Sequence, residues 1–438
     1  MTKDSLALAI EALSWIGYAG IGERGALLKA SQQLEIRSPN ELRQAHRLIM
    51  ETTRFQNRID WIISQVMPED TLKRAPHGIH SLLRILAYSK YVDNGHQSEK
   101  MLSWARQILG WRDLQSYEEC MARLVSGRVR LTWGGLSEYE RLALETCHPA
   151  WYVALLVRIF GRDFALRILK RDLRPLPAFA RVNRLIVDDE DLVARRLQGS
   201  KVEGVMDAYR LDRTKRPEER TKLSASGKII LQDLSGIVAG LAASPKPGQT
   251  VLDVCSAPGN KTTHLAAQMN NEGQIYSIDL ANLRLLQWKR ETTRAGSSIA
   301  QAIQADARSL PLNNSADVVF VDPPCSNSGV FARNPASKWK ITPVLLKELV
   351  SRQSAILQSA SEHLRTGGIL VYCTCSILPE ENESVVGTFL KKNPEFNMVV
   401  QDPFVGSPGL RGFTKCQRFY SHLHNCNGHF IAKLQRSG

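Results

Sequence analysis

The second half of the chain alternates apolar strands with amphipathic helices, and this alternation limits the folds that it can form. The patterns are, in chain order, 250–254 (strand), 261–269 (helix), 274–279 (strand), 283–293 (helix), 316–321 (strand), 344–364 (helix), 368–372 (strand) and 428–434 (strand). Because parallel strands need crossover connections, which are usually helices, the alternation predicts a doubly wound, mostly parallel sheet of the α/β class.

The N-terminal part of the chain has a different pattern, in which apolar residues recur at helical spacing. Ile59, Ile62 and Val66 form one such face, and periodicity of this kind predicts helices. A chain of 438 residues is also longer than one typical domain. We therefore expect three parts, at residues 1–145 (all α), 146–235 (linking region) and 236–438 (α/β).

The charge balance of the chain suggests a polyanionic partner. Lys and Arg number 57 against 43 Asp and Glu, a formal net charge of +14, and a basic surface attracts nucleic acid. A solvated surface of Lys and Arg is the other interpretation, and composition alone leaves both open. The chain has no apolar run of the roughly 18 residues that span a bilayer, and its start lacks the pattern of a signal peptide. We therefore expect a cytoplasmic protein that is not bound to a membrane.

The eight cysteines of the chain are scattered, and no two form a Cys-x-x-Cys pair. This arrangement argues against a disulfide scaffold and against a zinc knuckle. The best metal candidate is the group of His422, His424 and Cys426, which we interpret instead as a polar turn before the last strand. We therefore expect no bound metal.

The segment from Asp253 to Lys261 lies where the first strand of the α/β region meets its helix, and it has the character of a cofactor loop. In open α/β sheets, ligands bind beyond the carboxyl ends of the strands. Gly259 permits close approach of the backbone, whose N–H groups can meet a ligand. An ordinary strand–helix turn is the simpler interpretation of this segment taken alone.

Two acids follow the next strands of the pattern. Asp279 ends the second strand, where a carboxylate can accept hydrogen bonds from both hydroxyls of a ribose, and Asp306 ends a third strand, where it can face an adenine edge. The segment lacks the glycine signatures of dinucleotide and phosphate-loop sites. S-adenosylmethionine carries no phosphate and fits these residues better.

Two further stretches, Val321–Cys325 and Tyr372–Ser376, each place a thiol after a predicted strand. Because the two strands are predicted neighbours, Cys325 and Cys375 can reach one pocket. Methylation at C5 of a pyrimidine needs a thiolate that adds to C6, an acid that stabilises charge on the ring, and a base that removes the C5 proton. Two thiols, an acid and a cofactor loop are the groups that this reaction requires.

The remaining cysteines near these motifs have a simpler explanation. A lone cysteine is usually a small buried hydrophobe, and this is our interpretation of Cys255 and Cys373. Strand alternation leaves open that Cys373 turns to the same side as Cys375. We prefer Cys375 as the reactive thiol because it ends the strand and precedes a polar turn.

Together these motifs resemble the RsmB (Sun/Fmu) family of S-adenosylmethionine-dependent RNA cytosine-5 methyltransferases, and the similarity extends over nearly the whole chain. The matching segments are Asp322–Cys325, Thr374–Ser376, Pro379–Asn382, Arg181–Asn183 and Gln232–Asp233. Two more favour this branch over other RNA cytosine-5 methyltransferases, namely His148–Trp151 and Lys338–Trp339.

The resemblance implies a role for each site residue. The cysteine of the Thr-Cys motif, here Cys375, is the nucleophile that bonds to C6. The cysteine of the Pro-Cys motif, here Cys325, assists release of the product, and Asp322 contacts the target base near the methyl end of the cofactor. The implied cofactor contacts are Cys255, Ser256, Ala257, Pro258, Gly259, Asn260, Lys261, Asp279, Asp306 and Asp322.

The resemblance also implies a class I Rossmann-like methyltransferase domain, preceded by an all-α domain of NusB-like fold that binds RNA. The region 146–235 would link the two and take part in RNA recognition, and the family suggests a monomer. Three residues depart from the family pattern: Asn260 replaces a glycine, Ser256 an alanine and His429 an aromatic residue. The expected substrate is small-subunit rRNA; the alternatives are tRNA methylation by the same chemistry and a non-catalytic RNA-binding or assembly factor.

Overall fold

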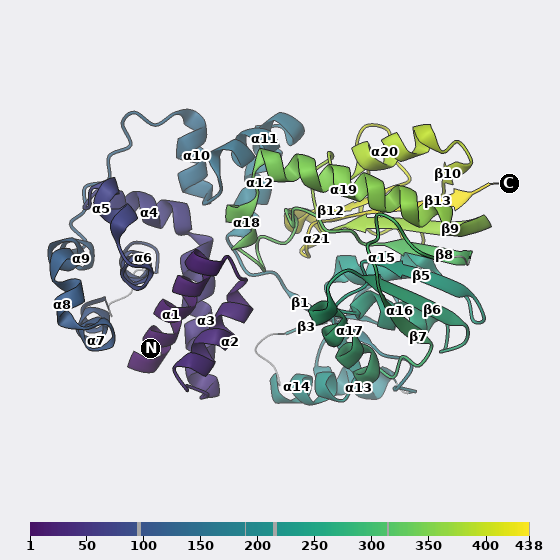
Figure 1. Ribbon diagram of the computed structural model, residues 1–438, viewed down its shortest axis with the longest axis horizontal. Helices are drawn as coiled ribbons and strands as arrows, with labels where there is room; N and C mark the ends of the chain where they lie inside the picture. The colour runs from purple at the N-terminus through teal and green to yellow at the C-terminus, as the bar shows by residue number, and fades with distance from the viewer. Residues whose placement is uncertain (94–97, 189, 213–216, 313–314, 438) are drawn as a thin grey trace. The chain divides into compact units, whose positions relative to one another are not determined.

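The computed structural model describes residues 1–93, 98–188, 190–212, 217–312 and 315–437, which divide into two compact units (Figure 1). We call them the helical unit, Met1–Arg174 with Phe331–Lys340, and the sheet unit, Pro175–Val330 with Ile341–Gly438. The segment Phe331–Lys340 thus belongs to the helical unit, although in the sequence it lies between two parts of the sheet unit.

Within its described residues, every element of the helical unit is a helix, as predicted for the N-terminal region. The helices are α1 (Lys3–Ala19), α2 (Glu23–Gln33), α3 (Pro39–Arg54), α4 (Gln56–Ser64), α5 (Glu69–Arg74), α6 (His77–Tyr91), α7 (Ser98–Leu109), α8 (Trp111–Leu114), the 3-10 helix η1 (Gln115–Tyr117), α9 (Glu118–Ser126), α10 (Glu138–Thr146), α11 (Ala150–Phe160), α12 (Arg162–Asp172) and α18 (Ser337–Lys340). The apolar faces of α1 to α9 form one core, in which Ile59 and Ile62 of the predicted face are buried and Val66 is partly buried.

The sheet unit begins with a small antiparallel sheet of strand order β2–β3–β1–β4. Its elements are β1 (Ala178–Val182), α13 (Glu190–Leu197), β2 (Ser200–Lys201), β3 (Ala208–Leu211), α14 (Pro217–Ala225) and β4 (Ile229–Leu231). Ala180, Val182 and Ile229 are buried in a core of their own. This sheet lies in the region 146–235, which was predicted to link the two domains and to take part in RNA recognition, but not to form a sheet.

The larger sheet has the order β11–β12–β13–β9–β8–β5–β6–β7, with β10 paired to β13. Its elements are α15 (Leu234–Ala243), β5 (Thr250–Val254), α16 (Asn260–Gln268), β6 (Gln274–Asp279), α17 (Asn282–Arg294), β7 (Ala300–Gln304), β8 (Ala316–Val321), α19 (Pro343–Glu362), β9 (Leu364–Thr374), α20 (Glu383–Lys392), β10 (Phe396–Met398), β11 (Ser407–Pro408), β12 (Gln417–Phe419), α21 (Ser421–His424) and β13 (His429–Arg436). Strands β9, β8, β5, β6 and β7 run parallel, and β13 joins β9 antiparallel. The predicted mostly parallel α/β sheet is confirmed.

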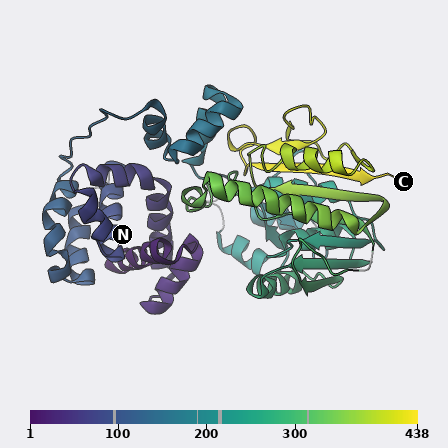
Figure 2. The same cartoon turned by 45° about the horizontal axis from the view of Figure 1, so that its top comes forward.

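Helices cover both faces of this sheet, as Figure 2 shows. Side chains of α15 and α16 pack in one core with Val251, Phe320 and Val371, whereas α19 and α20 pack on the other side with Val254 and Val321. The alternation of neighbours along β5 and β8 between the two cores follows from the two-residue period of a strand. Both faces are therefore buried, and the chemistry is confined to the strand ends.

The register of the central strands aligns their carboxyl ends. Val254 of β5 lies opposite Val321 of β8, which lies opposite Tyr372 of β9. The loops that follow these three strands consequently start at one edge of the sheet, where parallel α/β sheets hold their ligands. Among the helices that the structure describes, none combines the length and apolar character that crossing a bilayer requires.

Candidate active site

The two predicted thiols meet beyond the ends of β8 and β9. The Sγ atoms of Cys325 and Cys375 lie 3.1 Å apart, and the Cys375 thiol donates a hydrogen bond of 2.9 Å to Oδ1 of Asn327. Both cysteines are partly exposed and carry no disulfide. The hydrogen bond with Cys375, followed by burial, raises the pKa of Cys325 well above its ordinary value. Cys325 is therefore held as a thiol beside Cys375.

An ion pair stands next to the thiols on the α16 side of the sheet. Lys261 Nζ, in the first turn of α16, donates a 2.6 Å hydrogen bond to Oδ2 of Asp322, with the side chains 18% and 27% exposed. Burial alone lowers the pKa of Lys261, but the Asp322 carboxylate outweighs it and raises that pKa. The arrangement keeps the Asp322 carboxylate oriented in a partly buried place.

Cys373 lies beside this ion pair. It is buried in the core that packs on α15 and α16, with its Sγ 3.8 Å from Oδ1 of Asp322. Burial, followed by the Asp322 charge, raises the pKa of Cys373 well above its ordinary value. The orientation of Cys373 was left open by the sequence, and in the structure its side chain faces the core on the α15 and α16 side of the sheet, next to Asp322.

A buried carboxylate fixes the loop that carries Cys325. Glu381 is fully buried, and its Oε1 accepts hydrogen bonds from the backbone N–H of Ser326 at 2.8 Å and from Nε2 of Gln353 at 2.9 Å. Its Oε2 accepts from Oγ of Ser326 at 2.5 Å. Gln353 Nε2 also reaches the carbonyl oxygen of Pro324 at 2.9 Å. The loop is therefore held after Cys325 by Glu381 itself and before Cys325 by Gln353, which is in turn bonded to Glu381.

The neighbouring residue Asn382 fixes the loop that carries Cys375. Its Oδ1 accepts a 2.6 Å hydrogen bond from the Thr374 hydroxyl, and its Nδ2 donates a 2.9 Å bond to the Ser376 carbonyl oxygen. From the sequence, Glu381 and Asn382 were identified only as part of a family motif on a polar turn just after Cys375. The partners of Asn382 lie within eight residues of it, whereas Ser326, the partner of Glu381, lies 55 residues away.

The predicted cofactor loop follows β5 and is closed by Asp279 at the end of β6. The Asp279 carboxylate is buried and accepts the backbone N–H groups of Ala257 and Ala281, each at 3.2 Å. Gly259, before α16, has a φ of +108°, a conformation that L side chains rarely adopt. At the strand end, Asp253 accepts the Thr262 hydroxyl at 2.6 Å, and burial raises its pKa to about 7.

Asp306 stands apart from the other predicted contacts. It lies two residues after β7, its side chain is 37% exposed, and its carboxylate is bonded to the guanidinium of Arg308. Those hydrogen bonds from Arg308 lower the pKa of Asp306 to about 2. An adenine edge at this position would meet an acid that already has a cation as partner.

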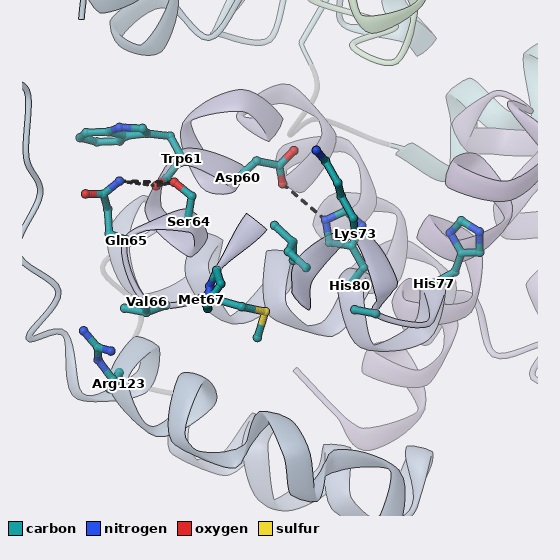
Figure 3. Close-up of a pocket in the computed structure, with 13 residues that line it drawn as sticks. Asp60, Trp61, Ser64, Gln65, Val66, Met67, Lys73, His77, His80 and Arg123 are labelled. Carbon is teal, nitrogen blue, oxygen red and sulfur yellow. Dashed lines mark hydrogen bonds and ion pairs between the residues drawn. The ribbon is translucent and has the colours of Figure 1, made fainter. Parts of the chain in front are cut away.

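A separate cavity lies elsewhere, in the helical unit. Its volume is about 860 Å³, and Trp61, Met67, Lys73 and His80 are among its lining residues (Figure 3). No cysteine lines it, so its side chains do not suit the chemistry that the thiols of the sheet unit offer. Among the described residues, no group of three or more His, Cys, Asp and Glu is arranged to hold a metal ion.

Comparisons with known proteins agree with this geometry. Residues 241–435 match the family described as 16S rRNA methyltransferase RsmB/F. The chain is 31% identical over 308 residues to the probable ribosomal RNA small subunit methyltransferase B of Bacillus subtilis (strain 168), and the alignment covers 68% of each chain. It is 37% identical over 217 residues to the tRNA (cytosine(72)-C(5))-methyltransferase of Pyrococcus horikoshii, and this alignment covers 49% of this chain and 54% of that relative.

The fold is also known from solved structures. The crystal structure of PH0851 has a TM-score of 0.85 to this chain at 27% identity, and the match covers 100% of this chain and 99% of that one. With the family match over the sheet unit and the B. subtilis relative over two thirds of both chains, the assignment is direct. The chain belongs to the RsmB/F family of S-adenosylmethionine-dependent RNA methyltransferases.

Proposed function

We propose that this protein methylates C5 of a cytosine in RNA by way of a covalent bond between Cys375 Sγ and C6 of the base. The observation that carries the proposal is the thiol pair, with its sulfurs 3.1 Å apart beside the ion pair of Lys261 and Asp322. C5 of cytosine is too weak a nucleophile to take a methyl group unaided. Addition of a thiolate at C6 makes C5 enamine-like, which is the purpose of covalent catalysis here.

The loop after β5 fits S-adenosylmethionine. Each oxygen of Asp279 holds one backbone N–H, and a carboxylate has lone pairs left to accept two ribose hydroxyls. The residues that would hold the cofactor are Cys255 to Lys261, Asp279, Asp306 and Asp322. When bound, the cofactor supplies a methyl group on a positively charged sulfur, which the nearby Asp322 carboxylate complements.

The reaction then follows from the positions of four side chains. The Cys375 thiolate bonds to C6, and the electron pair of the C5–C6 double bond becomes available at C5 for the methyl group. Asp322, oriented by Lys261, stabilises the charge that develops on the ring. A base takes the C5 proton, the C5–H electron pair restores the C5–C6 double bond, and the C6–S bond breaks so that Cys375 leaves as a thiolate; Cys325 assists this release from 3.1 Å away. The base must first leave its stack, at a cost of a few kcal/mol.

Cysteine variants test this mechanism. Cys375→Ala is expected to abolish methyl transfer while S-adenosylhomocysteine still binds, because the cofactor loop does not depend on that thiol. Cys325→Ala is expected to trap a covalent RNA–protein adduct, visible as a shifted band on a denaturing gel. Cys120→Ala, which alters a buried thiol of the helical unit, serves as control and retains full activity. Normal turnover by Cys325→Ala without any adduct would refute the two-thiol mechanism.

We infer that the substrate is small-subunit rRNA, since the relative named for that substrate matches 68% of this chain and the tRNA enzyme matches 49%. The 37% identity to the tRNA enzyme makes tRNA the second candidate. Bisulfite sequencing of rRNA and tRNA from cells with and without the gene separates the two. Loss of one protected cytosine in small-subunit rRNA supports the inference, and loss in tRNA alone replaces the substrate but keeps the chemistry.

We further infer that the protein acts as a monomer in the cytoplasm and that the all-α part and the region 146–235 contact RNA. The excess of 57 basic over 43 acidic residues supports this binding. Affinity that rests on phosphate contacts falls steeply with salt. Counterion release is visible between roughly 50 and 200 mM salt, so the affinity for rRNA fragments should fall over this range of KCl. Affinity that does not change with salt would contradict the inference.

A further inference from the structure

Asn327 approaches the reactive sulfur more closely than any acid or base of the motif does among the described hydrogen bonds. Its Oδ1 lies 2.9 Å from Cys375 Sγ, and its Nδ2 lies 3.4 Å from the carbonyl oxygen of Cys325. The second contact sets the orientation of the amide, with the oxygen toward Cys375 and the nitrogen away from it. Asn327 thus contacts both cysteine residues of the site.

The backbone at Asn327 is held in an uncommon conformation. Its φ is +59°, in the left-handed region that non-glycine residues rarely occupy and that Asn tolerates better than most. The residues on either side fix it: Ser326 is bound by Glu381, and the Ser328 hydroxyl lies 2.9 Å from the Ser376 hydroxyl. Such conformations persist where surrounding contacts enforce them, and they cluster at active sites.

We propose that Asn327 is a further catalytic residue, whose side-chain amide holds the Cys375 sulfur and governs whether that sulfur carries a proton. The inference rests on the proposed role of Cys375 as nucleophile. With Oδ1 toward the sulfur, Asn327 accepts the S–H proton and favours the thiol. Half a turn of the amide gives up the 3.4 Å contact with the Cys325 carbonyl oxygen and lets Nδ2 donate to the sulfur, which favours the thiolate, while the proton passes to water.

The chemistry of the amide explains why this position suits Asn rather than Asp. An amide offers both an acceptor and a donor, whereas an ionised carboxylate only accepts. A carboxylate beside the sulfur would add a like charge, which disfavours the thiolate. A residue that only shaped the turn would need the positive φ alone, and glycine supplies that conformation without any side chain.

Two variants separate the catalytic role from a structural one. Asn327→Asp keeps the shape and removes the donor, and Asn327→Gly keeps the backbone conformation and removes the amide. The readouts are the rate at which iodoacetamide labels Cys375 at one fixed pH, followed by peptide mass spectrometry, and methyl transfer to RNA. Labelling needs no RNA, so it reports on Asn327 even if Cys375 proves not to be the nucleophile. Melting temperature and S-adenosylhomocysteine affinity check that each variant is folded.

The expected pattern is a split between the two readouts. Asn327→Asp slows labelling of Cys375 by about tenfold or more, because a like charge opposes the thiolate, and lowers kcat in parallel. Asn327→Gly leaves labelling as fast as in the wild type or faster, because no acceptor holds the S–H proton, yet it lowers kcat. Wild-type labelling and kcat in both variants would overturn the proposal. Equal slowing in both variants, together with lower melting temperatures, would also overturn it and leave only a structural role.

Discussion

Glu381→Gln tests whether the buried carboxylate beneath the thiols positions the loop of Cys325. The glutamine has the same size, so the change removes charge and not volume. Three donors reach this carboxylate, namely Ser326 N–H, Ser326 Oγ–H and Gln353 Nε2–H. A hydrogen bond to a charged group contributes about 1.5–3 kcal/mol, against about 0.5–1.5 kcal/mol for a neutral one. Over three bonds the difference amounts to about 3 kcal/mol of unfolding free energy.

The assay has two parts, chemical denaturation of the full chain and methyl transfer at a temperature where the variant is folded. We expect both to fall, because the Cys325 loop loses its anchor. Gln401→Ala is a matched control: its buried amide also makes three hydrogen bonds, to Lys415, Ile431 and Gln417, and none involves the thiol loops. A Glu381→Gln protein that loses stability but keeps wild-type turnover would refute the reasoning, as would an equal loss of turnover in the control.

Three further predictions follow from buried groups of the sheet unit. His429 is a buried imidazole whose Nε2 has no hydrogen-bond partner among the described residues, and burial, followed by the charge of Lys261, lowers its pKa to about 3. Below pH 6.5 the unfolded chain gains a proton at His429 and the folded chain does not, so the folded state loses stability as the pH is lowered. The His429→Phe variant should lose less stability per pH unit in a denaturation series, and equal slopes in the two proteins would contradict this. Arg418→Met alone leaves Glu383 buried without its cation and should cost about 3–5 kcal/mol, whereas the double variant with Glu383→Leu should recover most of that in the same denaturation assay. Gly329→Ala would place a Cβ 2.1 Å from the backbone oxygen of Gly428, so we expect loss of methyl transfer and a lower melting temperature. Wild-type values for both would show that the segments of Gly329 and Gly428 can separate without consequence.

The fold of the sheet unit could be predicted because each element has its own local pattern. The predicted strands at 250–254, 274–279 and 316–321 coincide with β5, β6 and β8, since a buried parallel strand is an apolar run bounded by turn residues. The predicted strand at 368–372 is part of a longer one, β9, because pairing with β8 begins at Leu364 and pairing with β13 continues to Thr374. The small sheet of β1 to β4 was missed because its strands are short and its strand β1 pairs with β3 and β4, which follow in the sequence only after α13 and α14.

The candidate site could be predicted only as far as its motifs are local. Asp322 and Cys325 flank two prolines at the end of one predicted strand, and Cys375 follows the end of another, so all three can be identified from the sequence. Asn327 and Glu381 have no such signal, because what makes them part of the site is a partner 48 to 55 residues away in the sequence. Hydrogen bonds across that separation depend on strand order and register, which are properties of the folded sheet.

One consequence concerns the turn from Pro379 to Asn382, which offers no group to the reaction. Glu381 holds the loop of Cys325, and Asn382 holds the loop of Cys375. In the proposed mechanism the two thiols act as a pair, which must be held to within about 0.5 Å, and two loops anchored separately would add their errors. Anchoring both to adjacent residues of one turn makes any displacement of that turn common to both thiols, so their 3.1 Å separation is preserved when the turn moves. A motif without reactive groups can therefore be as necessary for the chemistry as the thiols themselves.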